Sequence, residues 1–398
     1  MSSSHSFFKV KHPWSRLKDE VLKAYLAPYL AKIAKTRNPV IIADCFAGKG
    51  RFENGEPGSP LIITEAISRQ LSDPLSPEIK GVFIEKQYFK ELKANIPELP
   101  WLTILEGDYE DRIEFFIRQY EAHNQNLLLY VDPYGIKSVL FSYFERIQQK
   151  GFNSVELVLN LNAFGFLREG CRLLKKPDSE NETPDYYEVD VNSPERLDEI
   201  AGGDYWRKIV DDYYAKPIKN MQEAEERFIA QYCERLRRVF RYVINIPIKA
   251  KLKYIPKYRI VYGTNHADGF LLMVDNMHKR WADFREDARN HQSPLFECDF
   301  PDPSKQLDCW NIDDRICSYI DQEIDLKDLL VRLAQDFGIS FSTSEYKEQL
   351  KKMENDRIIV TRVPPTTPTG KASKSWDHKS KELTIKITRR DQWQPPLL

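Results

Sequence analysis

The sequence predicts an α/β fold, in which a Rossmann-like sheet of seven strands with a helical insertion is followed by a smaller C-terminal domain. Short apolar runs alternate with stretches of helical periodicity in the first half of the chain, as in parallel strands joined by crossover helices. Several runs end at an acidic residue, at the edge where such sheets bind ligands. The 398 residues also exceed the roughly 250–300 over which one core usually grows.

Continuous apolar runs, typical of strands buried on both faces, mark the strands of the sheet. The expected strands cover residues 39–43, 81–84, 102–105, 127–131, 155–160, 242–248 and 258–262. The expected helices cover residues 14–35, 59–71, 87–96, 109–123, 221–239 and 269–284. The strand pattern weakens at residues 171–240, which we expect to form the insertion in a first domain of residues 1–299.

Residues 308–390 follow a winged-helix pattern after a proline-containing spacer. The expected helices cover residues 313–323, 326–337 and 344–354, and the expected strands cover residues 358–362 and 383–388. Lys347 and Lys351 lie one turn apart on the third helix, and the basic segment 363–381 would form the wing. These features favour contact with a nucleic-acid backbone, and a protein-docking module is the alternative.

Composition argues against several classes of protein. The formal net charge of −1 gives no overall signal of nucleic-acid binding, so any basic surface must be local. None of the six cysteines forms a Cys-x-x-Cys pair and no histidine completes a metal-ligand spacing, so we expect reduced thiols and no metal site. No apolar run reaches the ~18 residues of a membrane span, and residues 1–11 lack the apolar core of a signal peptide. We therefore expect a cytoplasmic protein.

Polar residues at four successive strand ends predict a binding site for S-adenosylmethionine. This cofactor combines an amino-acid tail, a ribose and an adenine. Gly48 and Gly50 let the backbone approach the tail, and Asp44 before them can hold its ammonium group. Glu85 is placed to accept hydrogen bonds from the ribose hydroxyls, and Asp108 from the adenine amino group.

The turn that contains these glycines also carries Phe46, which we expect to contact the cofactor. A glycine turn alone is weak evidence, whereas the ordered set of strand-end residues is more specific. The spacing of a phosphate-binding loop is absent. The alternative is a doubly wound domain whose acids are solvated and bind no cofactor.

Several motifs resemble the three-Cys-motif partner family of bacterial proteins. They are residues 44–50 (DCFAGKG), 58–61 (GSPL), 107–108 (GD), 131–135 (VDPYG), 258–266 (YRIVYGTNH) and 273–277 (MVDNM). The resemblance covers residues 14–281. The family is named for a neighbouring cysteine-motif protein that resembles radical-SAM enzymes, so the resemblance implies such a protein as a partner. It leaves open a non-catalytic, methyltransferase-like scaffold.

Residues 44–52 and 58–61 also resemble, more distantly, the 23S ribosomal RNA adenine-N6 methyltransferase that acts on naked RNA. In that enzyme a lysine of the N-terminal helix and the serine of the second motif reach the carboxylate of the cofactor. The resemblance implies these roles for Lys18 and Ser59, and a cation and a hydroxyl suit a carboxylate. It further implies methyl transfer to an exocyclic amino group of RNA or DNA.

The catalytic motif of that enzyme is Asp-Pro-Pro-Tyr, whereas this chain has Asp132, Pro133 and Tyr134 followed by Gly135. The resemblance makes Asp132 and the backbone carbonyl of Pro133 acceptors for the target amino group, and Tyr134 a platform for a flipped base. The missing proline moves the aromatic ring one residue closer to the carboxylate, which puts adenine as the target in doubt. The alternative is a turn that only closes the cofactor pocket.

Overall fold

In the computed structural model, the described residues are 13–119, 124–136, 139–176, 191, 193–249, 254–290, 312–320, 323–355, 359–363, 376 and 384–388. The chain forms two compact units by its internal contacts, Met1–His266 and Ala267–Leu398. The helix α11 (Ala267–Asn290) therefore belongs to the second unit and not to the predicted first domain of residues 1–299.

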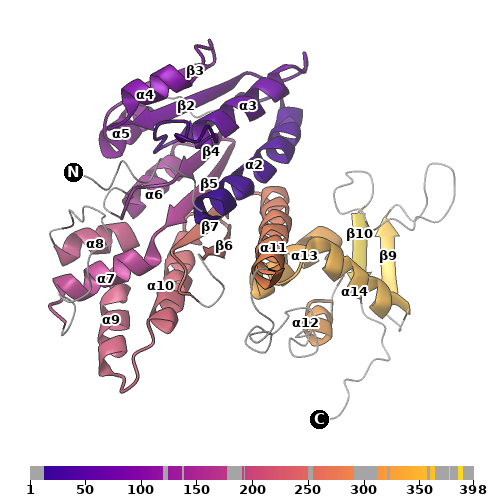
Figure 1. Cartoon of the computed structure of the whole chain (residues 1–398). Coiled ribbons are helices and arrows are strands. Elements are labelled where there is room, and N and C mark those ends of the chain that lie inside the picture. The colour runs from indigo at the N-terminus through magenta and orange to yellow at the C-terminus, as the bar shows by residue number, and fades with distance from the viewer. Residues whose placement is uncertain are drawn as a thin grey trace. The chain divides into compact units, whose positions relative to one another are not determined.

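The first unit is built around a seven-stranded sheet with the strand order β3-β2-β1-β4-β5-β7-β6 (Figure 1). Its strands are β1 (Val40–Asp44), β2 (Ile79–Glu85), β3 (Leu102–Glu106), β4 (Asn126–Val131), β5 (Ser154–Leu161), β6 (Tyr242–Ile248) and β7 (Tyr258–Thr264). The strands β1 to β5 are parallel, whereas β7 runs antiparallel to its neighbours β5 and β6. The predicted α/β class and seven-stranded sheet are confirmed.

The strand order reverses between β1 and β4, which lie side by side in the middle of the sheet. Every residue of β1, β4 and β5 is buried, which explains the apolar runs in these strands, although β5 also buries Glu156 and Asn160. The N–H of Cys45 donates to the carbonyl of Tyr130 at 2.9 Å, so the pairing continues past the end of β1. Ligands of open α/β sheets bind at such a reversal, beyond the carboxyl ends of the strands.

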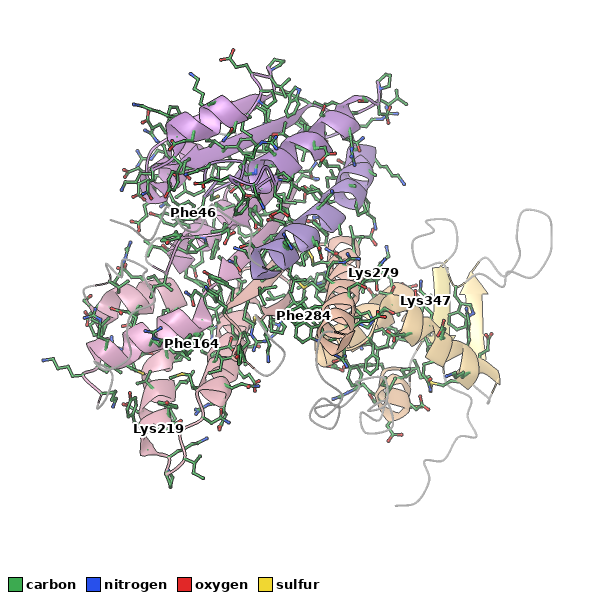
Figure 2. The ribbon with its side chains drawn as sticks, in the orientation of Figure 1. Phe46, Phe164, Lys219, Lys279, Phe284 and Lys347 are labelled. Atoms are coloured by element: carbon green, nitrogen blue, oxygen red, sulfur yellow. The ribbon has the colours of Figure 1, made fainter. Side chains whose placement is uncertain are left out.

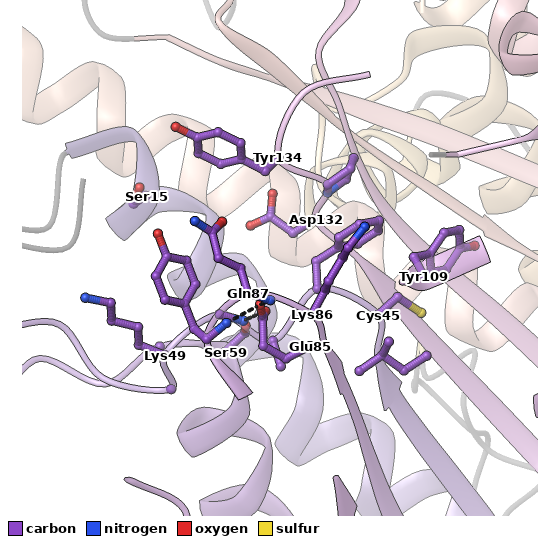
Figure 3. Close-up of a pocket in the computed structure, with 18 of the residues that line it drawn as sticks. Ser15, Cys45, Lys49, Ser59, Glu85, Lys86, Gln87, Tyr109, Asp132 and Tyr134 are labelled. Atoms are coloured by element: carbon purple, nitrogen blue, oxygen red, sulfur yellow. Dashed lines mark hydrogen bonds between the residues drawn. The ribbon is translucent and has the colours of Figure 1, made fainter. Parts of the chain in front are cut away.

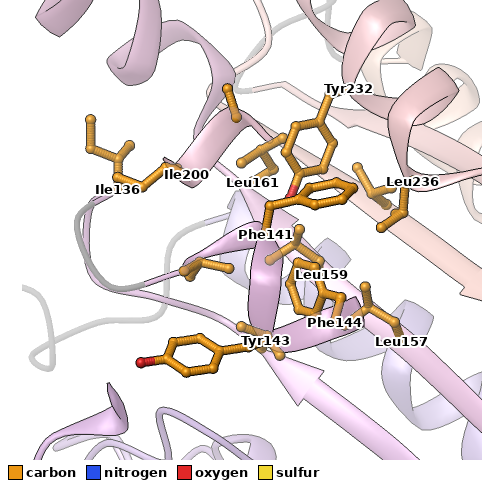
Figure 4. Packing of buried hydrophobic residues seen from close by; sticks show 14 of the residues in the cluster. Ile136, Phe141, Tyr143, Phe144, Leu157, Leu159, Leu161, Ile200, Tyr232 and Leu236 are labelled. Carbon is orange, nitrogen blue, oxygen red and sulfur yellow. The ribbon is translucent and has the colours of Figure 1, made fainter. Parts of the chain in front are cut away.

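Helices cover the sheet. The first of them, α2 (Pro13–Ile33), leads into a short 3-10 helix, η1 (Ala34–Thr36), and packs against α3 (Ser59–Leu71). A short helix, α4 (Phe89–Asn95), contacts β3. Apolar side chains of α5 (Tyr109–Gln119) and α6 (Phe141–Gln149) join a core cluster with alternate residues of β1, β4 and β5 (Figure 4).

The insertion extends this core cluster. Its helices are α7 (Ala163–Leu173), α8 (Pro194–Ala201), α9 (Tyr205–Ala215) and α10 (Met221–Leu236). The fully buried Trp206 meets Phe166 edge to face at 5.8 Å, and Phe166 stacks on Phe228 at 4.4 Å. Gly170 leaves room for the indole, because a Cβ atom there would lie 2.7 Å from Trp206. Residues 177–190 of the predicted insertion lie outside the described part of the chain.

The second unit combines α11 with α12 (Ile312–Tyr319), β8 (Ile324–Asp325), α13 (Leu326–Phe337), α14 (Thr343–Asn355), β9 (Ile359–Val363) and β10 (Thr384–Thr388). The strands form an antiparallel sheet in the order β8-β10-β9. The three predicted helices and two predicted strands are present, whereas the two-residue strand β8 was not predicted. Apart from Val363 and Trp376, the predicted wing lies outside the described residues, so the winged-helix assignment stays a prediction.

One carboxyl group of the first unit is buried among tyrosines. Glu156, on β5, accepts a hydrogen bond from the hydroxyl of Tyr25 on α2, and that hydroxyl lies 2.7 Å from the hydroxyl of Tyr262. Burial raises the pKa of Glu156 to about 7, although hydrogen bonds from both tyrosines lower it. Glu156 is therefore mostly protonated in the folded protein at mildly acidic pH.

We expect Glu156→Gln to flatten the pH dependence of stability. In the unfolded chain this carboxyl ionises near its usual pKa of 4.5, whereas the folded protein retains the proton up to about pH 7. The free energy of unfolding of the wild type therefore falls as pH rises between these two values. Since an amide does not ionise, the variant should lose about 1–3 kcal/mol less stability over this interval. Urea unfolding at both ends of the interval measures the difference, and equal pH dependence in the two proteins would refute the assignment.

Candidate functional site

A cavity of about 630 Å³ lies at the carboxyl ends of β1, β2, β3 and β4 (Figure 3). Its wall combines the turn after β1, the residues that follow the other three strands, and the beginning of α2. The predicted site residues that line it are Lys18, Phe46, Gly48, Gly50, Ser59, Glu85, Asp108, Asp132, Pro133 and Tyr134. The structure therefore brings nearly the whole predicted set together around one space.

The turn after β1 depends on its glycines. Gly48 and Gly50 have φ angles of 61° and 75°, a region that strains any residue with a side chain. The carbonyl of Gly50 accepts a hydrogen bond from the N–H of Gly58 at 2.9 Å, and the N–H of Ala47 donates to Ile84 at 3.0 Å. The turn is thus tied to β2 and to the start of α3, and it presents backbone to the cavity.

Glu85, the last residue of β2, anchors this turn with its carboxylate. Its Oε2 accepts a hydrogen bond from the N–H of Gly48 at 2.7 Å, and its Oε1 accepts from Gln87 at 2.7 Å and Tyr88 at 2.9 Å. Backbone N–H groups of this kind stabilise and orient an anion. Each carboxylate oxygen has two lone pairs, so Oε2 retains capacity for one further donor.

Asp44 lies beneath the turn and is not among the described residues that line the cavity. Its Oδ1 accepts a hydrogen bond from the N–H of Phe46 at 3.2 Å, while its fully buried Oδ2 has no hydrogen-bond partner among the described residues. Burial raises the pKa of Asp44 to about 7, an effect that Ser59 and the N–H of Phe46 partly oppose. Near neutral pH this carboxyl can therefore exchange a proton when a cation approaches it.

Asp108 forms an ion pair at the exposed side of the cavity. Its Oδ2 accepts a hydrogen bond from Nζ of Lys86 at 2.7 Å, and this contact raises the pKa of Lys86. Elsewhere on the wall the rings of Phe46 and Tyr109 lie 4.9 Å apart. The cavity thus offers both a carboxylate and an aromatic surface to a ligand.

Asp132 directly follows β4 and accepts hydrogen bonds from three side chains. Nζ of Lys18, on α2, lies 2.9 Å from Oδ1 and 2.7 Å from Oδ2. Asn160 on β5 donates to Oδ1 at 2.6 Å, and the hydroxyl of Tyr130 lies 3.5 Å from Oδ2. Lys18 also sits 5.1 Å from the ring centre of Tyr258. The residue expected to bind the cofactor carboxylate and the residue expected to bind the substrate therefore form one ion pair.

The turn after Asp132 exposes an aromatic ring. Pro133 and Tyr134 line the cavity, and the side chain of Tyr134 is half exposed (Figure 3). Gly135 has a φ angle of 97°, which only glycine adopts readily. This geometry leaves one edge of the cavity with a ring on which a planar group can stack.

Among the residues of the site that were not predicted, three contribute polar or aromatic groups next to Lys18 and Asp132. Asn160 interrupts an apolar strand, and such a buried amide is a signal that the sequence does contain. Ser15 and Tyr258 carry no comparable local pattern, since they reach the cavity only because α2 and β7 pack against the rest of the unit. The hydroxyl of Ser15 has no hydrogen-bond partner among the described residues.

No protein-family model matches the chain, and no curated protein sequence matches it. Among solved structures, spermidine synthase in complex with the transition-state analogue AdoDATO is 6% identical, with 72% of this chain and 73% of that chain covered and a TM-score of 0.32. The mycolic acid cyclopropane synthase CmaA1 complexed with SAH and CTAB is 12% identical, with 63% and 94% covered and a TM-score of 0.24. Loganic acid methyltransferase with SAH is 12% identical, with 75% and 89% covered and a TM-score of 0.27. Similarities this low do not assign a function.

Two features are absent from the part of the chain that the structure describes. No group of three or more His, Cys, Asp and Glu side chains there is arranged to hold a metal ion. No helix there is long and apolar enough to cross a membrane.

The three backbone hydrogen bonds of Glu85 predict that Glu85→Gln destabilises the fold. The amide replaces one acceptor oxygen by a donor, so at least one backbone N–H loses its charged acceptor, which should lower the free energy of unfolding by about 1–3 kcal/mol. Urea unfolding near neutral pH measures this loss. The matched control is Asp108→Asn, whose carboxylate pairs with an exposed lysine and should lose less than about 1 kcal/mol. Equal losses in both variants would contradict the anchoring role.

Proposed function

We propose that this chain is an S-adenosylmethionine-dependent methyltransferase that acts on an exocyclic amino group of a nucleic acid. The observation that carries the proposal is the convergence of a glycine turn and three strand-end acids on one cavity at the reversal point of the sheet. The cavity volume of about 630 Å³ falls within the roughly 300–1,000 Å³ of small-molecule sites.

The residues present fit this cofactor. Oδ2 of Asp44 has no hydrogen-bond partner among the described residues, so it offers an acceptor for an ammonium group at the turn, reached through water. The free lone pair of Glu85 suits a ribose hydroxyl, and Asp108 can accept a hydrogen bond from the adenine amino group. Phe46 and Tyr109 supply apolar wall. When bound, the sulfonium group supplies an activated methyl group with a neutral thioether as its leaving group.

In this proposal, Asp132, Pro133 and Tyr134 hold the target. The cofactor would supply the methyl group, with the C–S bond breaking as the N–C bond forms, and the amino group would then release one proton to the carboxylate of Asp132 or to water. The carboxylate of Asp132 and the carbonyl of Pro133 accept hydrogen bonds from the amino group, which orients the lone pair toward the methyl carbon. The ring of Tyr134 stacks on the base, and stacking alone does not select one base over another.

The second unit supports a nucleic-acid substrate. On α14, Tyr346 and Leu350 are buried, whereas Lys351 and Lys352 are exposed, and Lys347 lies on the same helix (Figure 2). A helix that buries its apolar side and presents cations to solvent can contact phosphates. We propose a winged-helix domain that binds the backbone of the substrate.

One observation favours a second candidate function, a non-catalytic partner of a radical-SAM-like cysteine-motif protein. Asp132 already accepts hydrogen bonds from Lys18 and Asn160, as a purely structural carboxylate would. In that case the methyltransferase-like fold would hold another protein without transferring a methyl group.

A transfer assay with tritium-labelled cofactor separates the two candidates. Total RNA, genomic DNA and lysate protein from a strain that lacks the gene serve as substrates, with and without the neighbouring gene product. The enzyme proposal predicts incorporation into a nucleic-acid fraction and its loss by at least about 100-fold in Asp132→Ala, because a positioned acceptor contributes this much to a reaction. Absence of incorporation in every fraction, with the protein folded, would favour the partner role.

A further inference from the structure

The hydrogen-bonding capacity of Asp132 is fully used in the structure. A carboxylate has about four lone-pair sites on its two oxygens. Oδ1 accepts from Lys18 at 2.9 Å and from Asn160 at 2.6 Å, while Oδ2 accepts from Lys18 at 2.7 Å and lies 3.5 Å from the hydroxyl of Tyr130. A substrate amino group therefore finds no vacant acceptor on Asp132 until one of these donors leaves.

Lys18 is the donor that can leave. Asn160 and Tyr130 belong to strands of the central sheet, which fix their positions. Lys18 sits on α2 at the end of a long flexible side chain, of which 8% is exposed, and it lines the cavity itself. An ammonium group in this position can turn from one anion to another without any change in the backbone.

Ser15 marks where a second anion would sit. It precedes Lys18 by one turn of α2, so both side chains lie on the same side of the helix, and both line the cavity. Ser15 is 4% exposed, and its hydroxyl has no hydrogen-bond partner among the described residues. Both residues lie in the first turns of a 21-residue helix, where the helix dipole favours negative charge.

The other serine of the cavity is engaged elsewhere. Ser59 interacts with the carboxyl of Asp44, which lowers the pKa of that group. The other cations in the cavity wall also have visible interactions. Lys86 pairs with Asp108 at 2.7 Å, Arg51 donates to the carbonyl of Gly55 at 2.7 Å, and Lys49 lies 5.1 Å from the ring centre of Tyr88. Ser15 and Lys18 are therefore the pair best arranged to receive a carboxylate.

The resemblance already implies that Lys18 binds the carboxylate of the cofactor's amino-acid tail. We propose that Ser15 completes this site, and that binding of the carboxylate draws Lys18 away from Asp132. The inference rests on the proposed function, because it takes the cofactor from there. Asp132 then keeps Asn160 and Tyr130 and gains two vacant acceptor positions for the substrate amino group. Cofactor binding thereby prepares the substrate site, and Ser15 acts as a residue that selects for the carboxylate.

Calorimetric titration with two probes tests this exchange. One probe is S-adenosylhomocysteine, and the other is its decarboxylated analogue, which keeps the ammonium group. The ratio of the two affinities isolates the contribution of the carboxylate. We expect this ratio to fall about 3–10-fold in Ser15→Ala, which loses a hydrogen bond from a neutral hydroxyl, and about 10–100-fold in Lys18→Met, which loses an ion pair.

Asp132→Asn is the decisive variant, because loss of a cavity residue ordinarily weakens binding. The amide keeps the shape of the carboxylate but releases Lys18, so the affinity ratio should rise about 3–10-fold. The matched control is Asp108→Asn, which removes a carboxylate from the same cavity and a different lysine, and it should leave the ratio unchanged. The proposed exchange of Lys18 would be refuted if both probes bound to the wild type and Asp132→Asn did not raise the ratio of their affinities. If neither probe bound to the wild type, the proposed function would be overturned as well.

Discussion

Four acidic residues lie at or just after the ends of four neighbouring parallel strands. The central constraint on this fold is that their charges must be compensated at one edge of the sheet. The structure compensates each in a different way. Glu85 is held by three backbone N–H groups, and Asp108 by an exposed lysine. Asp132 is paired with Lys18, whereas Asp44 pairs with no cation among the described residues and burial raises its pKa to about 7. These environments determine the role of each acid: Glu85 anchors the backbone, Asp108 and Asp132 face the cavity, and Asp44 can exchange a proton.

The strands of the sheet and the location of the site could both be predicted from the sequence. Strands buried on both faces must be continuous apolar runs, so the ends of β1, β2, β3 and β4 were visible to within a few residues. Since parallel strands share one carboxyl edge, the acids that follow these runs had to lie close together. The glycines at positions 48 and 50 were recognisable because only glycine adopts their φ angles readily.

Contacts between segments that are distant in the chain could not be predicted from the sequence. Lys18 and Asp132 are 114 residues apart in the chain, and only the packing of α2 in the first unit brings Nζ of Lys18 to 2.7 Å from Oδ2 of Asp132. The position of Asp44 beneath the turn depends on the path of the backbone after β1, which spacing does not reveal. The helices α7, α8 and α9 were also not predicted, although each places an apolar face in the core cluster.

Proton release during ligand binding tests the central claim most directly, because it reports whether a ligand in the cavity changes the ionisation of the buried Asp44 carboxyl. Titration with S-adenosylhomocysteine near pH 7 in two buffers of different ionisation enthalpy gives the number of protons released. An ammonium group above Asp44 favours the ionised carboxyl, so its pKa of about 7 should fall and roughly half a proton should leave per ligand bound. Asp44→Asn should abolish that release. Binding without any difference in proton release between the wild type and this variant, or no binding at all, would contradict the account.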